Sequence, residues 1–190
     1  MERDDTSALT KYDSRKNKLS RRGFMKSATA ASAVSLAGSA GFVHAEGSDR
    51  IRVGLIGCGG RGTGAAWQCV NAGGDIELYA MGDLFRDRLD GSAERLEKQA
   101  DGSRGKFNVG DRRFTGFDAY QQVIDSGVDL VILATPPHFR PLQLKVAIEA
   151  GKHVFMEKPV AVDPVGARSV IASSALADQK GLAIVAGTQR

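Results

Sequence analysis

A short glycine-rich segment limits the folds that this chain can adopt. Residues 57–62 read GCGGRG and fit the pattern G-x-G-x-x-G. They directly follow residues 51–56 (IRVGLI), an apolar and β-branched run that predicts a buried strand, and precede residues 64–72, which predict a helix. Between a strand and a helix, the first glycine permits a tight turn, the second lets the backbone approach a pyrophosphate, and the third lets the helix pack on the strand. The segment therefore predicts a dinucleotide-binding βαβ unit.

Predicted strands and helices alternate along the rest of the chain. Continuous apolar strands such as residues 130–134 indicate a sheet that is covered on both faces. Residues 101–113 are polar and predict a loop. The expected fold is α/β, a Rossmann-type doubly wound parallel sheet over residues 51–190. Further strands are expected at 76–81, 114–117, 130–134, 153–156 and 182–186, and further helices at 86–99, 119–125, 142–150 and 163–178.

An acidic residue stands at the position where such a fold reads the ribose. Asp83 ends the second predicted strand, 21 residues after Gly62. A carboxylate there accepts hydrogen bonds from the ribose hydroxyls and repels a 2′-phosphate, so NAD is favoured. Arg86 and Arg88 follow closely and are able to accommodate that phosphate, so NADP stays open. A glycine-rich turn that binds no ligand is the plainer alternative. The predicted cofactor-binding residues of this part are Gly57, Gly59, Gly60, Arg61, Gly62 and Asp83.

Two later strand ends add further candidates. Thr135 and Pro136 follow the strand at 130–134, and Glu157 and Lys158 follow the strand at 153–156. The carboxyl ends of parallel strands lie at one edge of the sheet, where ligands bind. We therefore expect all four residues beside the dinucleotide, with Pro136 as part of a stiff wall. For His138, a contact with the ligand stays open beside a structural or surface role, whereas His153 is expected to be structural.

The positive charge of the chain is confined to its first residues. The formal net charge is +4, and residues 1–26 hold eight basic and four acidic residues, whereas residues 46–190 hold 18 of each. No basic stripe is left for a phosphate backbone, which excludes a nucleic-acid partner from our expectations. The two cysteines, Cys58 and Cys69, form no C-x-x-C pair, so neither a disulfide nor a metal site is expected.

The basic segment has the order of an export signal. Residues 20–26 read SRRGFMK, and seven of the next 17 residues are Ser, Thr or Gly, too polar for a stable membrane span. Small residues at 43–45 suit a signal peptidase. The segment resembles a twin-arginine signal. This resemblance implies a signal peptide at 1–45, a linker at 46–50, the twin-arginine translocase as a partner, and a periplasmic or otherwise exported protein.

Several segments together resemble a known family. The chain is similar to the N-terminal half of the Gfo/Idh/MocA oxidoreductases, the family of glucose–fructose oxidoreductase and inositol dehydrogenase. The matching segments are residues 53–62, Asp83, residues 134–137 and residues 151–159 (GKHVFMEKP), of which the last is the most diagnostic. The resemblance implies hydride transfer between nicotinamide and a hydroxyl-bearing carbon of a sugar or polyol.

The same resemblance assigns roles to the residues after the fifth predicted strand. Lys158 becomes the catalytic residue that holds the substrate hydroxyl and relays its proton. Because an ordinary lysine is protonated near neutral pH, we expect a second group to share this work. Glu157 and Pro159 are implied to shape the nicotinamide end, with a cis bond before Pro159.

The resemblance also implies parts that this sequence does not contain. Family members carry a second α/β domain that supplies most of the substrate pocket, the partner acid or base and the subunit interface of a homo-oligomer. We therefore expect residues 51–190 to be a dinucleotide-binding half that is inactive alone. Two other functions stay open: an NAD-dependent glycoside hydrolase of the same superfamily, and a dinucleotide-binding module without catalysis.

Overall fold

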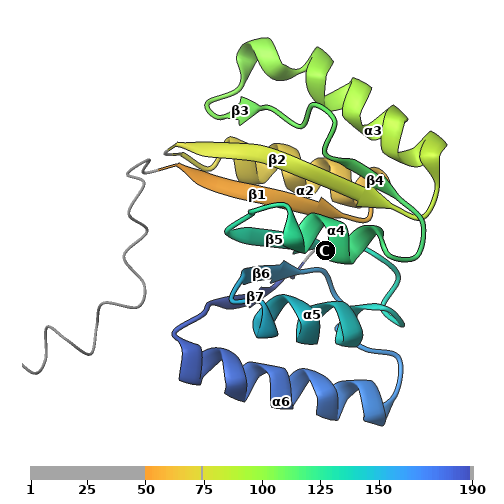
Figure 1. Ribbon diagram of the computed structural model, residues 1–190, viewed down its shortest axis with the longest axis vertical. Helices are drawn as coiled ribbons and strands as arrows, with labels where there is room; N and C mark the ends of the chain where they lie inside the picture. The colour runs from red at the N-terminus through yellow and green to blue at the C-terminus, as the bar shows by residue number, and fades with distance from the viewer. Residues whose placement is uncertain (1–49, 74, 189–190) are drawn as a thin grey trace, which may run out of the picture. The chain divides into compact units, whose positions relative to one another are not determined.

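The described part of the chain folds into one parallel sheet with helices on both faces (Figure 1). The computed structural model describes residues 50–73 and 75–188, so the predicted signal peptide lies outside the described residues. The strands are β1 (Ile51–Ile56), β2 (Ile76–Asp83), β3 (Lys106–Phe107), β4 (Arg113–Thr115), β5 (Leu130–Leu133), β6 (His153–Met156) and β7 (Ile184–Ala186). The helices are α2 (Gly60–Val70), α3 (Arg86–Lys98), α4 (Ala119–Asp125), α5 (Arg140–Glu149) and α6 (Pro164–Lys180), with a 3-10 turn η1 (Ala100–Gly102).

The strand order creates the crevice that a doubly wound fold uses for ligands. The strands run β3-β2-β1-β5-β6-β7, β4 also pairs with β2, and every pair is parallel. The chain leaves β1 toward β2 on one side and returns to β5 on the other, which places the topological switch between β1 and β5. The predicted Rossmann-type fold is thus confirmed.

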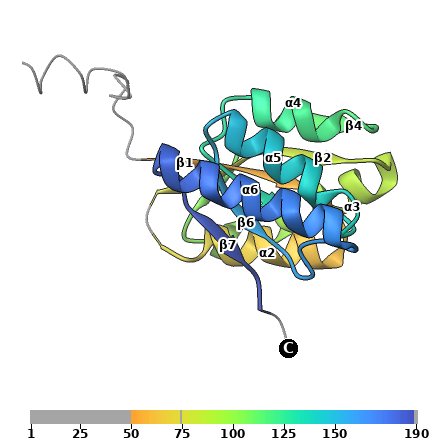
Figure 2. The same cartoon turned by 90° about the horizontal axis from the view of Figure 1, so that it is seen from below.

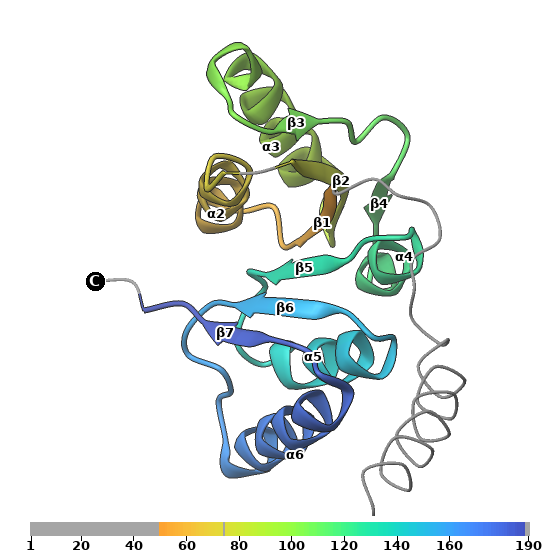
Figure 3. The same ribbon diagram turned by 90° about the vertical axis from the view of Figure 1, so that its left-hand side faces the viewer.

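Each face of the sheet has its own apolar core. Helices α2 and α3 cover one face, and α4, α5 and α6 cover the other (Figures 2 and 3). The first core gathers Leu55, Leu78 and Leu89, and the second gathers Leu133 and Leu144, all fully buried. Within residues 50–73 and 75–188, no helix combines the length and the apolar character that a membrane span requires.

Helix α2 begins inside the glycine motif, four residues before the predicted start. The Thr63 amide donates to the Gly59 carbonyl at 2.9 Å, which is the first bond of the helix. Glycine has a low helix propensity, and the close packing that Gly62 permits against the Gly57 carbonyl outweighs it here.

Strand β3 lies in the segment that was predicted to be a loop. It pairs with β2, so that Lys106 lies opposite Glu77 and Phe107 opposite Leu78. The Phe107 ring stacks on Trp67 of α2 with centroids 6.0 Å apart. A two-residue edge strand has no periodicity to detect, which explains why the sequence did not reveal it.

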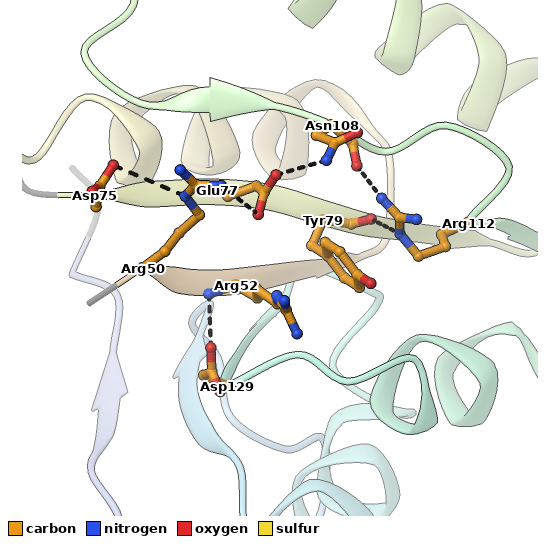
Figure 4. A network of polar contacts seen from close by, with 8 residues as sticks. All are labelled: Arg50, Arg52, Asp75, Glu77, Tyr79, Asn108, Arg112 and Asp129. Atoms are coloured by element: carbon orange, nitrogen blue, oxygen red, sulfur yellow. Dashed lines mark hydrogen bonds and ion pairs between the residues drawn. The ribbon is translucent and has the colours of Figure 1, made fainter. Parts of the chain in front are cut away.

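A polar network joins the amino-terminal part of the sheet (Figure 4). Glu77 is 3% exposed and accepts a hydrogen bond from Asn108 Nδ2 at 2.8 Å. Arg50 Nη1 lies 3.8 Å from the second Glu77 oxygen, so the last residue of the predicted linker already contacts the fold. The Arg112 guanidinium lies 3.7 Å from the centroid of the Tyr79 ring and donates to the Tyr79 carbonyl at 2.8 Å. These contacts fasten β1, β2 and the β3–β4 loop together.

Candidate dinucleotide site

One cavity opens at the carboxyl ends of β1, β2 and β5. Its volume is about 480 Å³. It lies at the topological switch, where an open α/β sheet places its ligands. Three separate loops contribute the predicted residues that line it, namely Gly57, Gly59, Asp83, Thr135 and Pro136. The other predicted residues, Gly60, Arg61, Gly62, Glu157 and Lys158, do not line this cavity.

The glycine motif owes its shape to backbone contacts that a side chain would prevent. Gly57 has a φ of +96°, and a Cβ atom there would lie 2.6 Å from the Thr135 nitrogen. A Cβ atom on Gly62 would lie 1.9 Å from the Gly57 carbonyl oxygen. At Gly59, by contrast, a Cβ atom would meet nothing within 4 Å. The backbone of Gly59 is therefore open on the side where a ligand would approach.

The start of α2 offers hydrogen-bond donors to an anion. The first three amides of an α-helix, here those of residues 60–62, have no partner within the helix. Gly59 precedes them and has no side chain that caps the helix. Free N–H groups and the positive end of the helix dipole attract phosphate oxygens. The residues present thus fit the pyrophosphate of a dinucleotide.

Asp83 is held in place by the backbone on both sides of the cavity rim. One carboxylate oxygen accepts a hydrogen bond from the Cys58 amide at 2.6 Å, and the other accepts one from the Phe85 amide at 3.0 Å. Each oxygen retains a lone pair for a further donor. The carboxylate is therefore ordered before any ribose hydroxyl reaches it, a feature that the sequence did not reveal.

Apolar and aromatic side chains that the sequence analysis missed complete the cavity wall. Phe85 and Phe117 are 51% and 74% exposed although they are large and apolar. They follow the ends of β2 and β4, and this position after a strand end was the signal in the sequence. Such a wall suits a flat ring such as adenine. The large apolar and aromatic residues of this wall that lie outside the strands are Leu84, Phe85, Phe117, Tyr120 and Phe139.

Arg86 and Arg88 were named as able to accommodate the 2′-phosphate of NADP. Of these two arginines, only Arg88 lines the cavity. Its guanidinium lies 5.4 Å from the centroid of the Phe85 ring. Arg86 instead forms an ion pair with Asp90 at 3.9 Å and donates to the Thr115 hydroxyl at 3.4 Å.

Glu157 and Arg61 bind each other. The Glu157 side chain is 3% exposed, and its Oε1 atom accepts hydrogen bonds from Arg61 Nε at 2.7 Å and Nη2 at 2.6 Å. This pair links the first turn of α2 to the end of β6. Lys158 follows with an exposed side chain and a cis bond to Pro159, as the family resemblance implied.

The two cysteines lie apart and are both free thiols. Burial, and then the negative charge of Asp83, raise the pKa of the Cys58 thiol, and burial raises the pKa of the Cys69 thiol. In the part of the chain described here, no three His, Cys, Asp or Glu side chains are grouped so that they could hold a metal ion.

These thiols are expected to be unreactive in the folded protein. A raised pKa leaves less thiolate at any pH, and the thiolate is the species that attacks a disulfide reagent. At pH 8 we expect both cysteines to react with a chromogenic aryl disulfide at least about 10-fold more slowly than in guanidinium chloride. Fast reaction of Cys58 in the folded protein would contradict the burial described above.

Curated relatives match part of this chain. A glycosyl hydrolase family 109 protein of Shewanella sp. (strain ANA-3) is 33% identical over 114 residues, which cover 59% of this chain and 23% of that protein. An α-N-acetylgalactosaminidase of Shewanella oneidensis has the same identity and coverage. The chain thus spans about a quarter of the length of these relatives.

Solved structures share the fold. A scyllo-inositol dehydrogenase from Lactobacillus casei matches with a TM-score of 0.53 and 24% identity, over 73% of this chain and 36% of that one. A 3-ketoreductase from Actinomadura kijaniata, in complex with NADP and TDP-benzene, matches with a TM-score of 0.53 and 26% identity, over 73% of this chain and 37% of that one.

A family match covers the whole described sheet. The family described as "Oxidoreductase family, NAD-binding Rossmann fold" matches residues 51–187, a range that begins with β1 and ends one residue after β7. The chain therefore belongs to the Gfo/Idh/MocA oxidoreductase family, and these residues form its NAD-binding Rossmann domain.

Proposed function

We propose that this chain is the dinucleotide-binding part of an oxidoreductase that moves a hydride between nicotinamide and a hydroxyl-bearing carbon of a sugar or polyol. The observation that carries the proposal is that three loops line one shared cavity. The predicted residues that they contribute are Gly57, Gly59, Asp83, Thr135 and Pro136. The sheet edge that forms this cavity also presents Lys158 at the end of β6.

Lys158 is the proposed catalytic residue. Its side chain is exposed, and its amine makes no hydrogen bond or ion pair with any described residue. When bound, NAD would supply the acceptor for the hydride of a secondary alcohol. Oxidation of the alcohol also releases a proton from its hydroxyl group. We assign Lys158 to hold that hydroxyl and, together with a second acid or base, to relay the proton.

The substrate pocket belongs to a further domain in this proposal. Support comes from length, because the curated relatives are about four times as long as the matched segment. The test is to read the gene past the codon for Arg190. An open frame that encodes a further domain would support the proposal, whereas an immediate stop codon would favour a dinucleotide-binding module without a substrate site.

Export by the twin-arginine translocase is part of the same proposal. Its support is the SRRGFMK segment at residues 20–26. Replacing Arg21 and Arg22 with lysine should leave the precursor inside the cell, as fractionation and immunoblotting would show. Unchanged export of the double variant would remove this part of the proposal.

Cofactor choice gives a direct test of Asp83. A fixed carboxylate repels the 2′-phosphate of NADP, so NAD should bind about 10-fold or more tightly than NADP in a calorimetric titration. Asp83→Asn keeps the shape of the side chain and removes its charge, and should reduce this preference. Asp90→Asn, which makes the same change at an exposed carboxylate outside the cavity, is the control and should leave this preference unchanged. Tighter binding of NADP to the unaltered protein would overturn the role of Asp83.

A glycoside hydrolase is the second candidate function. The family 109 names of the curated relatives favour it. The match covers only about a quarter of the length of these relatives, so it does not distinguish glycoside hydrolysis from net oxidation of a sugar or polyol. An NAD-dependent hydrolase regenerates its nicotinamide in each cycle and needs no added acceptor. Turnover of an aryl glycoside without added NAD or acceptor would therefore favour hydrolysis over net oxidation.

A further inference from the structure

Arg140, at the start of α5, is a buried cation that bonds almost entirely to backbone oxygens. The residue is 6% exposed. Its Nε atom donates to the Thr135 carbonyl at 2.7 Å, and its Nη1 atom donates to the carbonyls of Glu157 at 2.6 Å and Pro159 at 2.5 Å. Burial lowers the pKa of this guanidinium, and the negative charge of Glu157 opposes that shift.

These three carbonyls belong to the two loops that matter for the site. Thr135 is in the loop after β5, which walls the dinucleotide cavity, and Glu157 and Pro159 are on either side of Lys158 after β6. One planar guanidinium thus joins both loops, and it reaches the residue before Lys158 and the residue after it. The fixed fork of an arginine suits such a set of acceptors, whereas the single ammonium of a lysine does not.

A second set of bonds holds the same segment from other directions. The Glu157 amide donates to the Leu133 carbonyl at 3.0 Å, and the Glu157 carboxylate is paired with Arg61. Lys158 itself contributes no side-chain bond to any described residue. The backbone on which Lys158 stands is therefore fixed by its neighbours, and the side chain is free to meet a ligand.

We propose that Arg140 is a positioning residue, which clamps the loops after β5 and β6 so that the Lys158 amine faces the nicotinamide end of a bound dinucleotide. This inference rests on the proposed function of Lys158. It goes further in assigning the placement of that lysine to a residue that no motif singled out. Displacing a reacting group by about 1 Å costs about 100-fold in rate, so losing such a clamp should appear in rates more than in affinity.

The test uses a probe that reports the position of Lys158 and requires no substrate. Periodate-oxidised NAD carries ribose-derived aldehydes, and an amine held beside one of them forms an imine with loss of water. Cyanoborohydride reduces the imine to a stable secondary amine, and peptide mass spectrometry locates it. The maximal labelling rate at saturating probe reports geometry, whereas the concentration for half-maximal rate reports binding.

The variants are Arg140→Lys, which keeps the charge, and Arg140→Ala, which leaves room for an added guanidinium ion. Arg168→Ala removes an exposed arginine on α6 and is the control. For both Arg140 variants we expect the maximal labelling rate of Lys158 to fall about 10-fold to 100-fold. The half-saturating concentration should rise by a smaller factor, since Arg140 also lines the dinucleotide cavity. Millimolar guanidinium should restore part of the rate, and part of any lost thermal stability, in Arg140→Ala only.

Hydrogen exchange of the peptide spanning residues 155–162 separates the failure of this inference from the failure of the proposed function. Faster exchange in both Arg140 variants, but not in Arg168→Ala, supports the clamp. If the unaltered protein binds NAD yet leaves Lys158 unlabelled, the proposed role of Lys158 fails. The hydrogen-exchange rates then serve as the one test of whether Arg140 clamps the two loops. Labelling and exchange that match the unaltered protein in both Arg140 variants would overturn the inference.

Discussion

Replacing Lys158 with alanine is expected to lower the kcat of the proposed oxidoreductase by about 10²-fold to 10⁴-fold, the usual contribution of a positioned acid or base. NAD affinity should stay within a few-fold, because Lys158 does not line the cavity at the switch point. Steady-state kinetics and calorimetry on the same preparation measure the two quantities.

Lys145→Ala is the matched control for that experiment. Lys145 is an exposed lysine of α5 whose amine lies 3.9 Å from Glu149, so its loss should leave kcat unchanged. Turnover that survives the Lys158 substitution would show that another group carries the proton. The oxidoreductase proposal would then need a different catalytic residue.

Replacing Gly62 with alanine should damage both the fold and dinucleotide binding. The new Cβ atom would lie 1.9 Å from the Gly57 carbonyl oxygen, a distance that requires the backbone to move. We expect a loss of stability of at least about 3 kcal/mol and no NAD binding in the micromolar range. Thermal melts with and without NAD measure both effects.

Gly91→Ala is the matched control, since Gly91 is also a helical glycine, and a Cβ atom there would meet nothing within 4 Å. Alanine at that position in α3 should raise stability by about 0.5–1 kcal/mol and leave NAD binding unchanged. Opposite signs for the two substitutions would assign the damage to the contact with Gly57. Equal tolerance of both would contradict the packing of α2 against the glycine turn.

The sequence predicted the fold well because its signals are local. An apolar run such as residues 130–134 indicates a strand without knowledge of its neighbours, and β5 is found there, one residue shorter. The helix expected at 86–99 is likewise α3, again one residue shorter. Strand β3 was missed because its two residues depend on pairing with β2 and on stacking against Trp67.

For the site, the sequence identified residue types but not their partners. Asp83 was expected at the rim, and it is there, but its two bonds to the amides of Cys58 and Phe85 depend on how the turns close. Arg61 and Glu157 were both expected beside the cofactor, and nothing in the sequence indicated that their side chains bind each other across 96 residues. Arg140 carried no signal, because it stands two residues before the helix expected at 142–150 and because arginines are usually exposed.

The polar network at the amino-terminal end of the sheet has a consequence for how this domain tolerates change. Arg50, Glu77 and Asn108 share no bonding partner with the loops around Asp83 or Lys158. The six residues of β1 separate the two ends by roughly 17 Å. At such separations, the energetic effects of substitutions usually add with little coupling. A substitution in the Arg50–Glu77–Asn108 network is thus expected to change the free energy of unfolding without altering the effect of a second substitution in the ligand-facing loops.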